Sequence, residues 1–193
     1  MYLVVSFVAL TFDRRMHEQS TGGVAAGRER KLRAMLSFRI TGVPAAAFSS
    51  LFGLDDAALA ERGAKRYTVD AKPGFPDRIE MRDLEPGEHA LLVNYVHQPA
   101  ATPYRASHAI FIREGAEETY DRCDEIPEVL RVRTLSLRAF DTEHMMLDAD
   151  LTDGTNVERL IERMFADERT AYIHAHYAKR GCFAARIGRN ERL

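Results

Sequence analysis

Strand-like segments follow one another along this chain, and one clear amphipathic helix interrupts them. Residues 155–165 place apolar side chains at helical spacing, whereas segments such as 132–140, 145–151 and 171–177 fit the two-residue period of a strand. Shorter helices are expected after Pro44 and over residues 56–62, where Asp55 can cap the N-terminus. About seven strands and three helices, with no regular strand–helix alternation, predict an α+β fold with a mainly antiparallel sheet.

Composition excludes several classes of protein. The 193 residues suffice for one domain with a sizeable core, and 46% apolar with 29% charged residues is ordinary for a globular chain. The net charge of -2 provides no basic field to recruit nucleic acid. The sequence contains no run of 18 apolar residues, so no membrane-spanning helix is predicted. Two cysteines do not make a disulfide framework, so we expect a cytoplasmic protein that binds neither nucleic acid nor membrane.

Residues 1–34 differ from the rest of the chain. An apolar run over residues 1–12 is followed by a polar, basic stretch, which is the reverse of the order in a secretory signal. Met35 directly precedes a strand-like segment, and we interpret it as the natural start. The chain is then expected to consist of a leader, residues 1–34, that is disordered or over-extended, and a single α+β domain, residues 35–193.

A pair of histidines marks the strand-like segment 172–177. Because a strand points alternate side chains to one face, His174 and His176 are expected to share a face with Tyr172, opposite Ile173 and Ala175. We predict that His174 and His176 are the catalytic residues. Two adjacent imidazoles can bind a metal, transfer protons or hold an anion, and they can also be structural groups inside a sheet.

The metal hypothesis requires a third ligand from elsewhere in the chain. The candidates on other predicted strands and turns are His97, His108, Asp141 and His144. The sequence lacks the glutamate that cupin metal sites carry after their His-x-His pair. The sequence therefore assigns neither a metal nor any other cofactor.

A second polar cluster spans residues 94–99 and 103–108. Pro99 and Pro103 bound a loop in which Arg105 can grip a carboxylate or phosphate through two hydrogen bonds. Alternatively, Arg105 pairs with a structural carboxylate and Tyr104 packs over the sheet. The predicted ligand-binding residues are His97, Tyr104, Arg105, His108, Arg138 and Arg180.

Arg180 belongs to a predicted hairpin tip with Lys179 and Gly181, and Cys182 follows it. Two cations on such a tip are usually solvated, but beside the histidine face they can attract an anion. Cys182 could be a nucleophile if a neighbouring histidine or arginine activated its thiol, but we interpret it as a buried, inert thiol. A Gly-rich phosphate loop, a Gly-x-Ser-x-Gly elbow and a Cys-x-x-Cys pair are all absent from the sequence.

Several of these segments resemble the domain-of-unknown-function family 1203 (DUF1203), a family of small bacterial proteins. The resemblance is carried by residues 94–99, 103–111, 135–141, 172–176 and 179–183. It extends over about residues 36–189. The family implies no activity, substrate or cofactor, so it does not choose among the interpretations of the histidines.

The functional hypothesis is an enzyme or small-ligand-binding protein that acts on a small anionic molecule. Arg105, Arg138 and Arg180 would hold the anion, and His174 and His176 would be acid–base or metal groups. The alternative is a protein–protein interaction module in which the histidines and arginines are structural. Gathering of these side chains in one concave site favours the first hypothesis, and dispersal over a flat face favours the second. Oligomeric state is not predicted.

Overall fold

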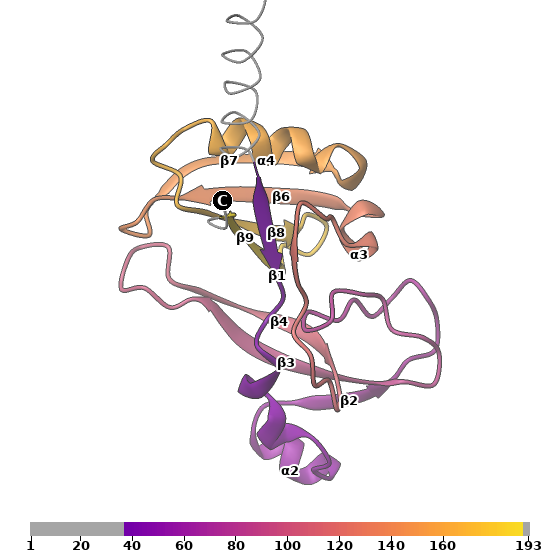
Figure 1. Ribbon diagram of the computed structural model, residues 1–193. Coiled ribbons are helices and arrows are strands. Elements are labelled where there is room, and N and C mark those ends of the chain that lie inside the picture. The colour runs from indigo at the N-terminus through magenta and orange to yellow at the C-terminus, as the bar shows by residue number, and fades with distance from the viewer. Residues whose placement is uncertain (1–36, 191–193) are drawn as a thin grey trace, which may run out of the picture. The chain divides into compact units, whose positions relative to one another are not determined.

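The computed structural model of the protein describes residues 37–190, which form two antiparallel sheets with helices around them (Figure 1). The larger sheet has six strands in the order β5-β1-β9-β8-β6-β7. These are β1 (Phe38–Thr41), β5 (Asp121–Cys123), β6 (Thr134–Phe140), β7 (Met146–Asp153), β8 (Tyr172–Tyr177) and β9 (Phe183–Arg189). The smaller sheet has the order β2-β3-β4, with β2 (Lys65–Thr68), β3 (His89–Gln98) and β4 (Ala106–Arg113). The predicted α+β class is confirmed.

The helices of the described part are short. The α-helices are α2 (Asp56–Glu61), α3 (Glu128–Arg131) and α4 (Val157–Phe165), and the 3-10 turns are η1 (Ala45–Ala47), η2 (Ser49–Leu51) and η3 (Gly154–Asn156). The Asp55 side chain accepts a hydrogen bond from the backbone N–H of Ala58 and caps α2 as predicted. No helix within residues 37–190 is both long and apolar enough to cross a membrane.

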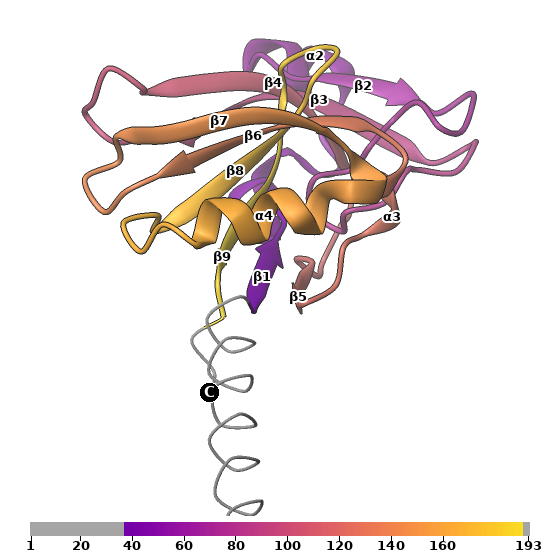
Figure 2. The ribbon, with the colours of Figure 1, turned by 90° about the horizontal axis from the view of Figure 1, so that it is seen from above.

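Helix α4 packs on one face of the larger sheet, against β6 and β7 (Figure 2). Its predicted apolar stripe is buried throughout: Val157, Leu160, Ile161, Met164 and Phe165. The stripe joins one core cluster with residues of the sheet, including Ile173 and Ala175 of β8. The odd-numbered residues of β8 therefore point toward this core.

The other face of β8 and β9 looks toward the smaller sheet. A second core cluster joins Leu91 and Val93 of β3 and Ile110 and Ile112 of β4 to Phe183 of β9. All six residues of β8 are buried, because this strand lies between two packed layers. The histidines of β8 thus lie inside the domain, between the two sheets.

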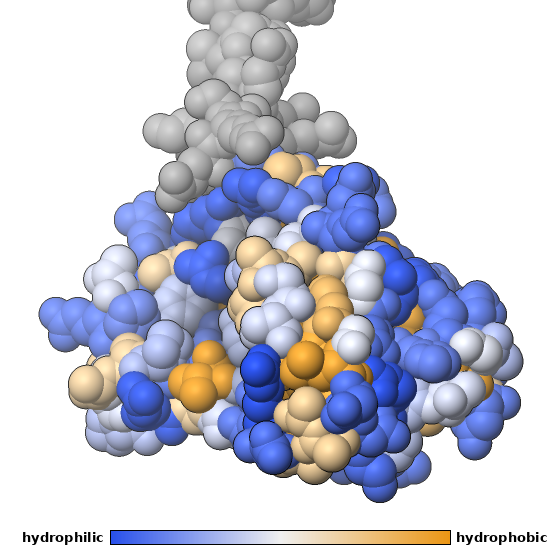
Figure 3. Space-filling model, turned by 90° about the horizontal axis from the view of Figure 1, so that it is seen from below, coloured by the Kyte–Doolittle hydropathy of each residue, from blue (hydrophilic) through white to orange (hydrophobic). Residues whose placement is uncertain are grey.

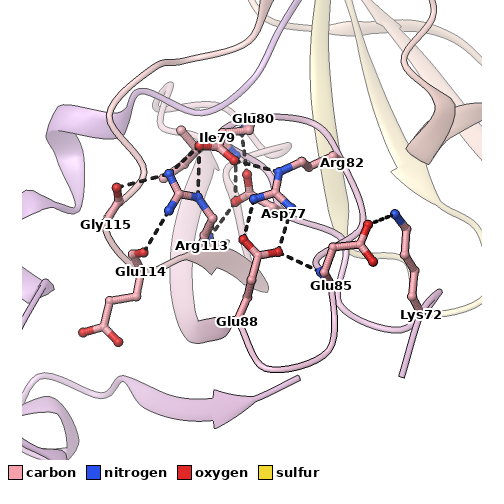
Figure 4. A network of polar contacts seen from close by, with 10 residues as sticks. All are labelled: Lys72, Asp77, Ile79, Glu80, Arg82, Glu85, Glu88, Arg113, Glu114 and Gly115. Carbon is pink, nitrogen blue, oxygen red and sulfur yellow. Dashed lines mark hydrogen bonds and ion pairs between the residues drawn. The ribbon is translucent and has the colours of Figure 1, made fainter. Parts of the chain in front are cut away.

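The connection between β2 and β3 is held by buried and half-buried charges (Figure 4). The fully buried carboxylate of Asp77 accepts hydrogen bonds from three backbone N–H groups, those of Ile79, Glu80 and Arg113. Burial nevertheless raises the pKa of Asp77 above its ordinary value. Arg82 bridges Glu80 and Glu88, donating to Glu88 through two bonds of 2.6 and 2.7 Å. These bonds fix the loop in one conformation.

The structure corrects several element boundaries. Residues 114–128 have the acidic, polar composition of a solvated loop, but they contain β5, which pairs with β1, and the first residue of α3. Strand β6 begins at Thr134 rather than at residue 132, since α3 ends just before it. Helix α4 begins after the turn η3 rather than at residue 155. The predictions for the leader, residues 1–34, concern residues outside the described part of the chain.

Candidate functional site

Strand β8 presents Tyr172, His174 and His176 on one face, as the two-residue period predicted. Ring centroids are 5.0 Å apart for Tyr172 and His174, and 6.3 Å apart for His174 and His176. In the sheet register His174 lies between Arg138 of β6 and Arg186 of β9. The face that carries the histidines therefore also carries two arginines.

The third imidazole comes from the smaller sheet. His97 sits where the register of β3 and β4 shifts between Val96 and Gln98, so it is the extra residue of a β-bulge. Its ring centroid lies 5.6 Å from that of His174 and 5.0 Å from that of His176. One ring nitrogen from each of these three histidines lies within 4.8 Å of the other two. We call His97, His174 and His176 the histidine triad.

The triad holds buried nitrogens without hydrogen-bond partners. His97, His174 and His176 are 8%, 3% and 0% exposed. Both ring nitrogens of His97, Nδ1 of His174 and Nε2 of His176 have no partner in the described part of the chain. Buried polar atoms are nearly always paired, so four unpaired nitrogens on three neighbouring rings are groups that a bound ion or ligand could satisfy.

One bond of the triad fixes a tautomer. Nδ1 of His176 lies 2.9 Å from the carbonyl oxygen of Gly181, at the turn between β8 and β9. A carbonyl oxygen accepts but cannot donate, so Nδ1 carries the proton and Nε2 carries the free lone pair. This is the arrangement in which a backbone carbonyl orients a metal-ligating histidine.

The triad is uncharged at neutral pH. The pKa is lowered to about 4 for His97, about 2 for His174 and about 3 for His176. Burial is the main cause in each case, and neighbouring positive charges, including that of Arg138, add to it. Neutral imidazoles retain the lone pairs that bind a metal ion.

Arg138 is a half-buried cation beside the triad. Burial lowers the pKa of Arg138, and within residues 37–190 its side chain has no hydrogen bond or ion pair. Arg186, which occupies the same row of the sheet, lies over the ring of Tyr172 at 4.7 Å. A half-buried guanidinium without a carboxylate partner is a favourable position for an anion.

Of three other predicted site residues, His108 lies near the triad, whereas Tyr104 and Arg105 are exposed. His108 is half-buried and stacks near His97, with ring centroids 6.3 Å apart. Tyr104 is exposed and meets Phe140 edge-on at 6.0 Å. Arg105 is exposed and donates to the carbonyl oxygen of Pro99, so the structure does not bring it to the triad.

Two side chains weighed as the third metal ligand have other partners. Nδ1 of His144 lies 2.8 Å from the hydroxyl of Tyr172. The carboxylate of Asp141 accepts the backbone N–H groups of Glu143 and Met145, each at 2.9 Å. His97 is thus the candidate that joins the two histidines of β8. Arg186 was not predicted as a site residue, although it follows the same register.

A cavity of about 910 Å³ is lined in part by His108, which stacks near His97, and none of the three triad histidines lines it. His108 and Arg180 line it together with Arg78, Arg133, Tyr177, Lys179 and Cys182. Cys182 is buried as predicted, and its sulfur accepts a hydrogen bond from Arg78 at 3.1 Å. We call this space the basic cavity.

Comparison with protein families identifies the class to which this fold and site belong. The family model described as "Protein of unknown function (DUF1203)" matches residues 74–189, which include the triad, Arg138 and every residue that lines the basic cavity except Tyr67 and Pro73. The chain belongs to the DUF1203 family, as its motifs suggested. Comparisons with curated proteins and with solved structures returned no match.

Proposed function

We propose that the protein binds one transition-metal ion at His97, His174 and His176 and holds a small anion beside it with Arg138. The site would serve an enzyme or a small-ligand-binding protein that acts on an anionic molecule. The observation that carries this proposal is the set of four buried, unpaired ring nitrogens on three converging imidazoles.

The donor set suits zinc or a similar ion. Zinc binds histidine nitrogens at about 2.0–2.1 Å in tetrahedral geometry, which places the nitrogens about 3.4 Å apart. The ligand nitrogens of the triad lie within 4.8 Å of one another, so small ring rotations would close them on an ion. Three protein ligands leave a fourth position open, as in catalytic rather than structural zinc sites.

The charge of the surroundings supports an anion at that open position. The triad itself includes no carboxylate, and Arg138 acts on all three imidazoles through its charge. A second cation near a metal ion is costly unless an anion lies between them. A bound hydroxide, phosphate or carboxylate would satisfy both the ion and the guanidinium.

The competing interpretations have weaker support. Histidines that serve only as structural groups would be expected to have hydrogen-bond partners. Within residues 37–190, the only ring nitrogen of the triad with such a partner is Nδ1 of His176. Proton transfer without a metal needs a pKa near the working pH, and burial moves all three well below it. A protein partner could not touch triad rings that are buried between two sheets.

Metal analysis tests the proposal. Protein purified without an affinity tag should retain about one equivalent of metal, or take it up from zinc or cobalt(II), whose visible absorption reports tetrahedral coordination. His97→Ala, His174→Ala and His176→Ala should each lose the ion, and His89→Ala, which changes an exposed histidine of β3, should keep it. Absence of uptake by the parent protein, or equal loss in His89→Ala, would overturn it.

The anion is tested separately on the cobalt protein. Inorganic phosphate should change the cobalt spectrum of the parent, and Arg138→Gln should keep the metal while weakening phosphate binding roughly tenfold or more. An Arg138→Gln protein that responds to phosphate like the parent would remove Arg138 from the proposal.

A further inference from the structure

We infer that the basic cavity is a second site, which binds a small amphipathic anion with an apolar body and one carboxylate or phosphate group. This goes beyond the proposed metal site, because none of the three proposed ligands lines the cavity. Its volume of about 910 Å³ falls within the range of small-molecule sites, about 300–1,000 Å³.

The charged side chains that line the cavity are all positive. Arg78, Arg133, Lys179 and Arg180 contribute four cations, and no aspartate or glutamate is among the lining residues. Arg133 donates to both oxygens of Asp83, at 2.6 and 2.8 Å, so its charge is compensated from outside the cavity. Arg78 is fully buried and bonds to the carbonyl oxygens of Pro76 and Phe183.

Lys179 and Arg180 are the cations that remain available. Both are exposed on the turn between β8 and β9, and their side chains have no hydrogen bond or ion pair within residues 37–190. Two neighbouring cations that face a cavity without acids repel each other unless an anion lies between them. We therefore place the carboxylate or phosphate group at these two side chains.

Another part of the lining is aromatic. Tyr67, Phe75 and Phe111 form a ring cluster, with centroid separations of 5.0 Å for Phe75 and Phe111 and 5.7 Å for Tyr67 and Phe111. All three rings are half-buried and line the cavity with Leu92. Half-buried aromatic surface gains by covering an apolar chain or ring of a ligand.

Tyr177 gives an independent indication of a missing partner. Its hydroxyl is buried and has no hydrogen-bond partner in the described part of the chain, and the residue lines the cavity. A phenolic hydroxyl is a hydrogen-bond donor, so it can donate to an oxyanion bound in the cavity. The guanidinium groups of Arg78 and Arg133 lie over its ring at 4.8 and 5.1 Å.

The cavity wall is held in place before any ligand arrives. Pro73, Phe75, Pro76 and Arg78 of the wall belong to the loop that the network of Asp77, Arg82 and Glu88 fixes (Figure 4). A wall that is already ordered lowers the entropic cost of binding.

Isothermal titration with two matched pairs of probes tests the inference. The pairs are octanoate with 1-octanol and phenyl phosphate with benzyl alcohol, and EDTA is present so that a bound metal plays no part. At least one anion should bind the parent protein, and tighter than its neutral counterpart by roughly tenfold or more. If octanoate binds and phenyl phosphate does not, the ligand class is an acyl carboxylate. If only phenyl phosphate binds, the ligand class is a phosphate ester.

Variants locate the binding. The double substitution Lys179→Ala with Arg180→Ala should weaken the anion roughly tenfold or more, and Val132→Trp, which fills part of the cavity from an exposed position, should abolish binding. Arg159→Ala, an exposed cation on α4, is the control and should bind like the parent. No binding of either anion, equal affinity for the neutral probes, or unchanged binding in both cavity variants would overturn the inference. Since metal uptake is measured without these probes, failure here leaves the metal proposal standing.

Discussion

His97 of β3 stacks on Phe183 of β9, with ring centroids 5.0 Å apart and ring planes only 5° from parallel. This contact joins the two sheets. Both residues lie at irregular points of their ladders, because β3 shifts register at His97 and β9 shifts register beside Phe183. The third imidazole thus reaches the two histidines of β8 through two bulges and one stacked pair.

Phe183→Leu should loosen this contact. Metal affinity should fall roughly 10-fold to 100-fold, as when the support of a metal ligand is removed, and the free energy of unfolding should fall by about 1–2 kcal/mol. Phe48→Leu is the matched control, since Phe48 is buried in the same core cluster and its ring contact is with Tyr95. Its stability should fall by a similar amount while zinc titration gives an unchanged affinity.

His97→Phe should make the metal-free protein more stable. The substitution keeps a ring against Phe183 and removes two buried ring nitrogens that have no partner. Urea unfolding in EDTA should give a gain of about 1–2 kcal/mol, together with complete loss of metal binding.

His176→Phe is the informative comparison for that gain. It removes the bond to the carbonyl oxygen of Gly181 and leaves that oxygen unpaired, so the free energy of unfolding should fall by about 1–3 kcal/mol. A loss of stability in His97→Phe as large as that in His176→Phe would mean that His97 is satisfied in the empty protein.

Glu88 should make stability depend on acid pH. The bonds from Arg82 are the main reason that the pKa of Glu88 is lowered from 4.5 to about 2. A carboxylate with a lowered folded pKa stabilises fully above its unfolded pKa, and this contribution disappears as pH falls from 4.5 to about 2. Since the side chain is 29% exposed, we expect on the order of 1–3 kcal/mol.

The measurement is urea unfolding of two variants across that pH range. Glu88→Gln should lower stability at pH 7 and show a smaller loss on acidification than the parent. Glu61→Gln, which changes an exposed carboxylate on α2, should follow the parent curve. Parallel curves for the parent and Glu88→Gln would refute the assignment.

Asp83 and Arg133 form an ion pair whose loss should be costly. The side chains of Asp83 and Arg133 are 7% and 19% exposed. Removing one partner therefore leaves the other as a buried charge without a counter-ion. Asp83→Ala should lower the free energy of unfolding by about 3–5 kcal/mol. Asp148→Ala, which removes an exposed partner of Arg163, should cost under about 1 kcal/mol in the same assay.

The segment that matches the family model should not fold alone. Residues 74–189 lack β1, which lies between β5 and β9, and they lack Ile40, a fully buried residue of the larger core. They also lack β2, which pairs with β3. Residues 37–190 should unfold in one cooperative transition by circular dichroism, whereas residues 74–189 should show none. If residues 74–189 unfolded with the same transition midpoint as residues 37–190, this prediction would be wrong.

Local periodicity predicted those elements in which each face of the strand or helix lies in a single environment along its length. The alternation of β8 placed His174 and His176 on one face, and the stripe of α4 identified its five buried residues. The antiparallel pairing of β3 with β4 is also local, because a short connection joins the two strands. Each of these depends on neighbours that are near in sequence.

The parts that sequence missed depend on distant neighbours. Strand β5 has two charged residues and a cysteine, and it is a strand because β1 lies beside it. His97 joins the triad through a bulge and the facing of two sheets, while Arg105, in a loop that looked equally suited, bonds to the nearby Pro99. The basic cavity combines Tyr67 of β2 with Cys182, which directly precedes β9, so its lining comes from segments far apart in sequence.

The position of β1 has a consequence for how the chain folds during synthesis. β1 is laid down first among these strands, yet one of its two neighbours is β9, and Nδ2 of Asn190 donates to Ser37 across 153 positions of sequence. At about 5–20 residues per second, on the order of ten seconds separate the translation of these two residues. During that interval β1 lacks its β9 neighbour, so Phe38 and Ile40, which end up buried in the larger core, stay exposed to non-native contacts until the last strand is made.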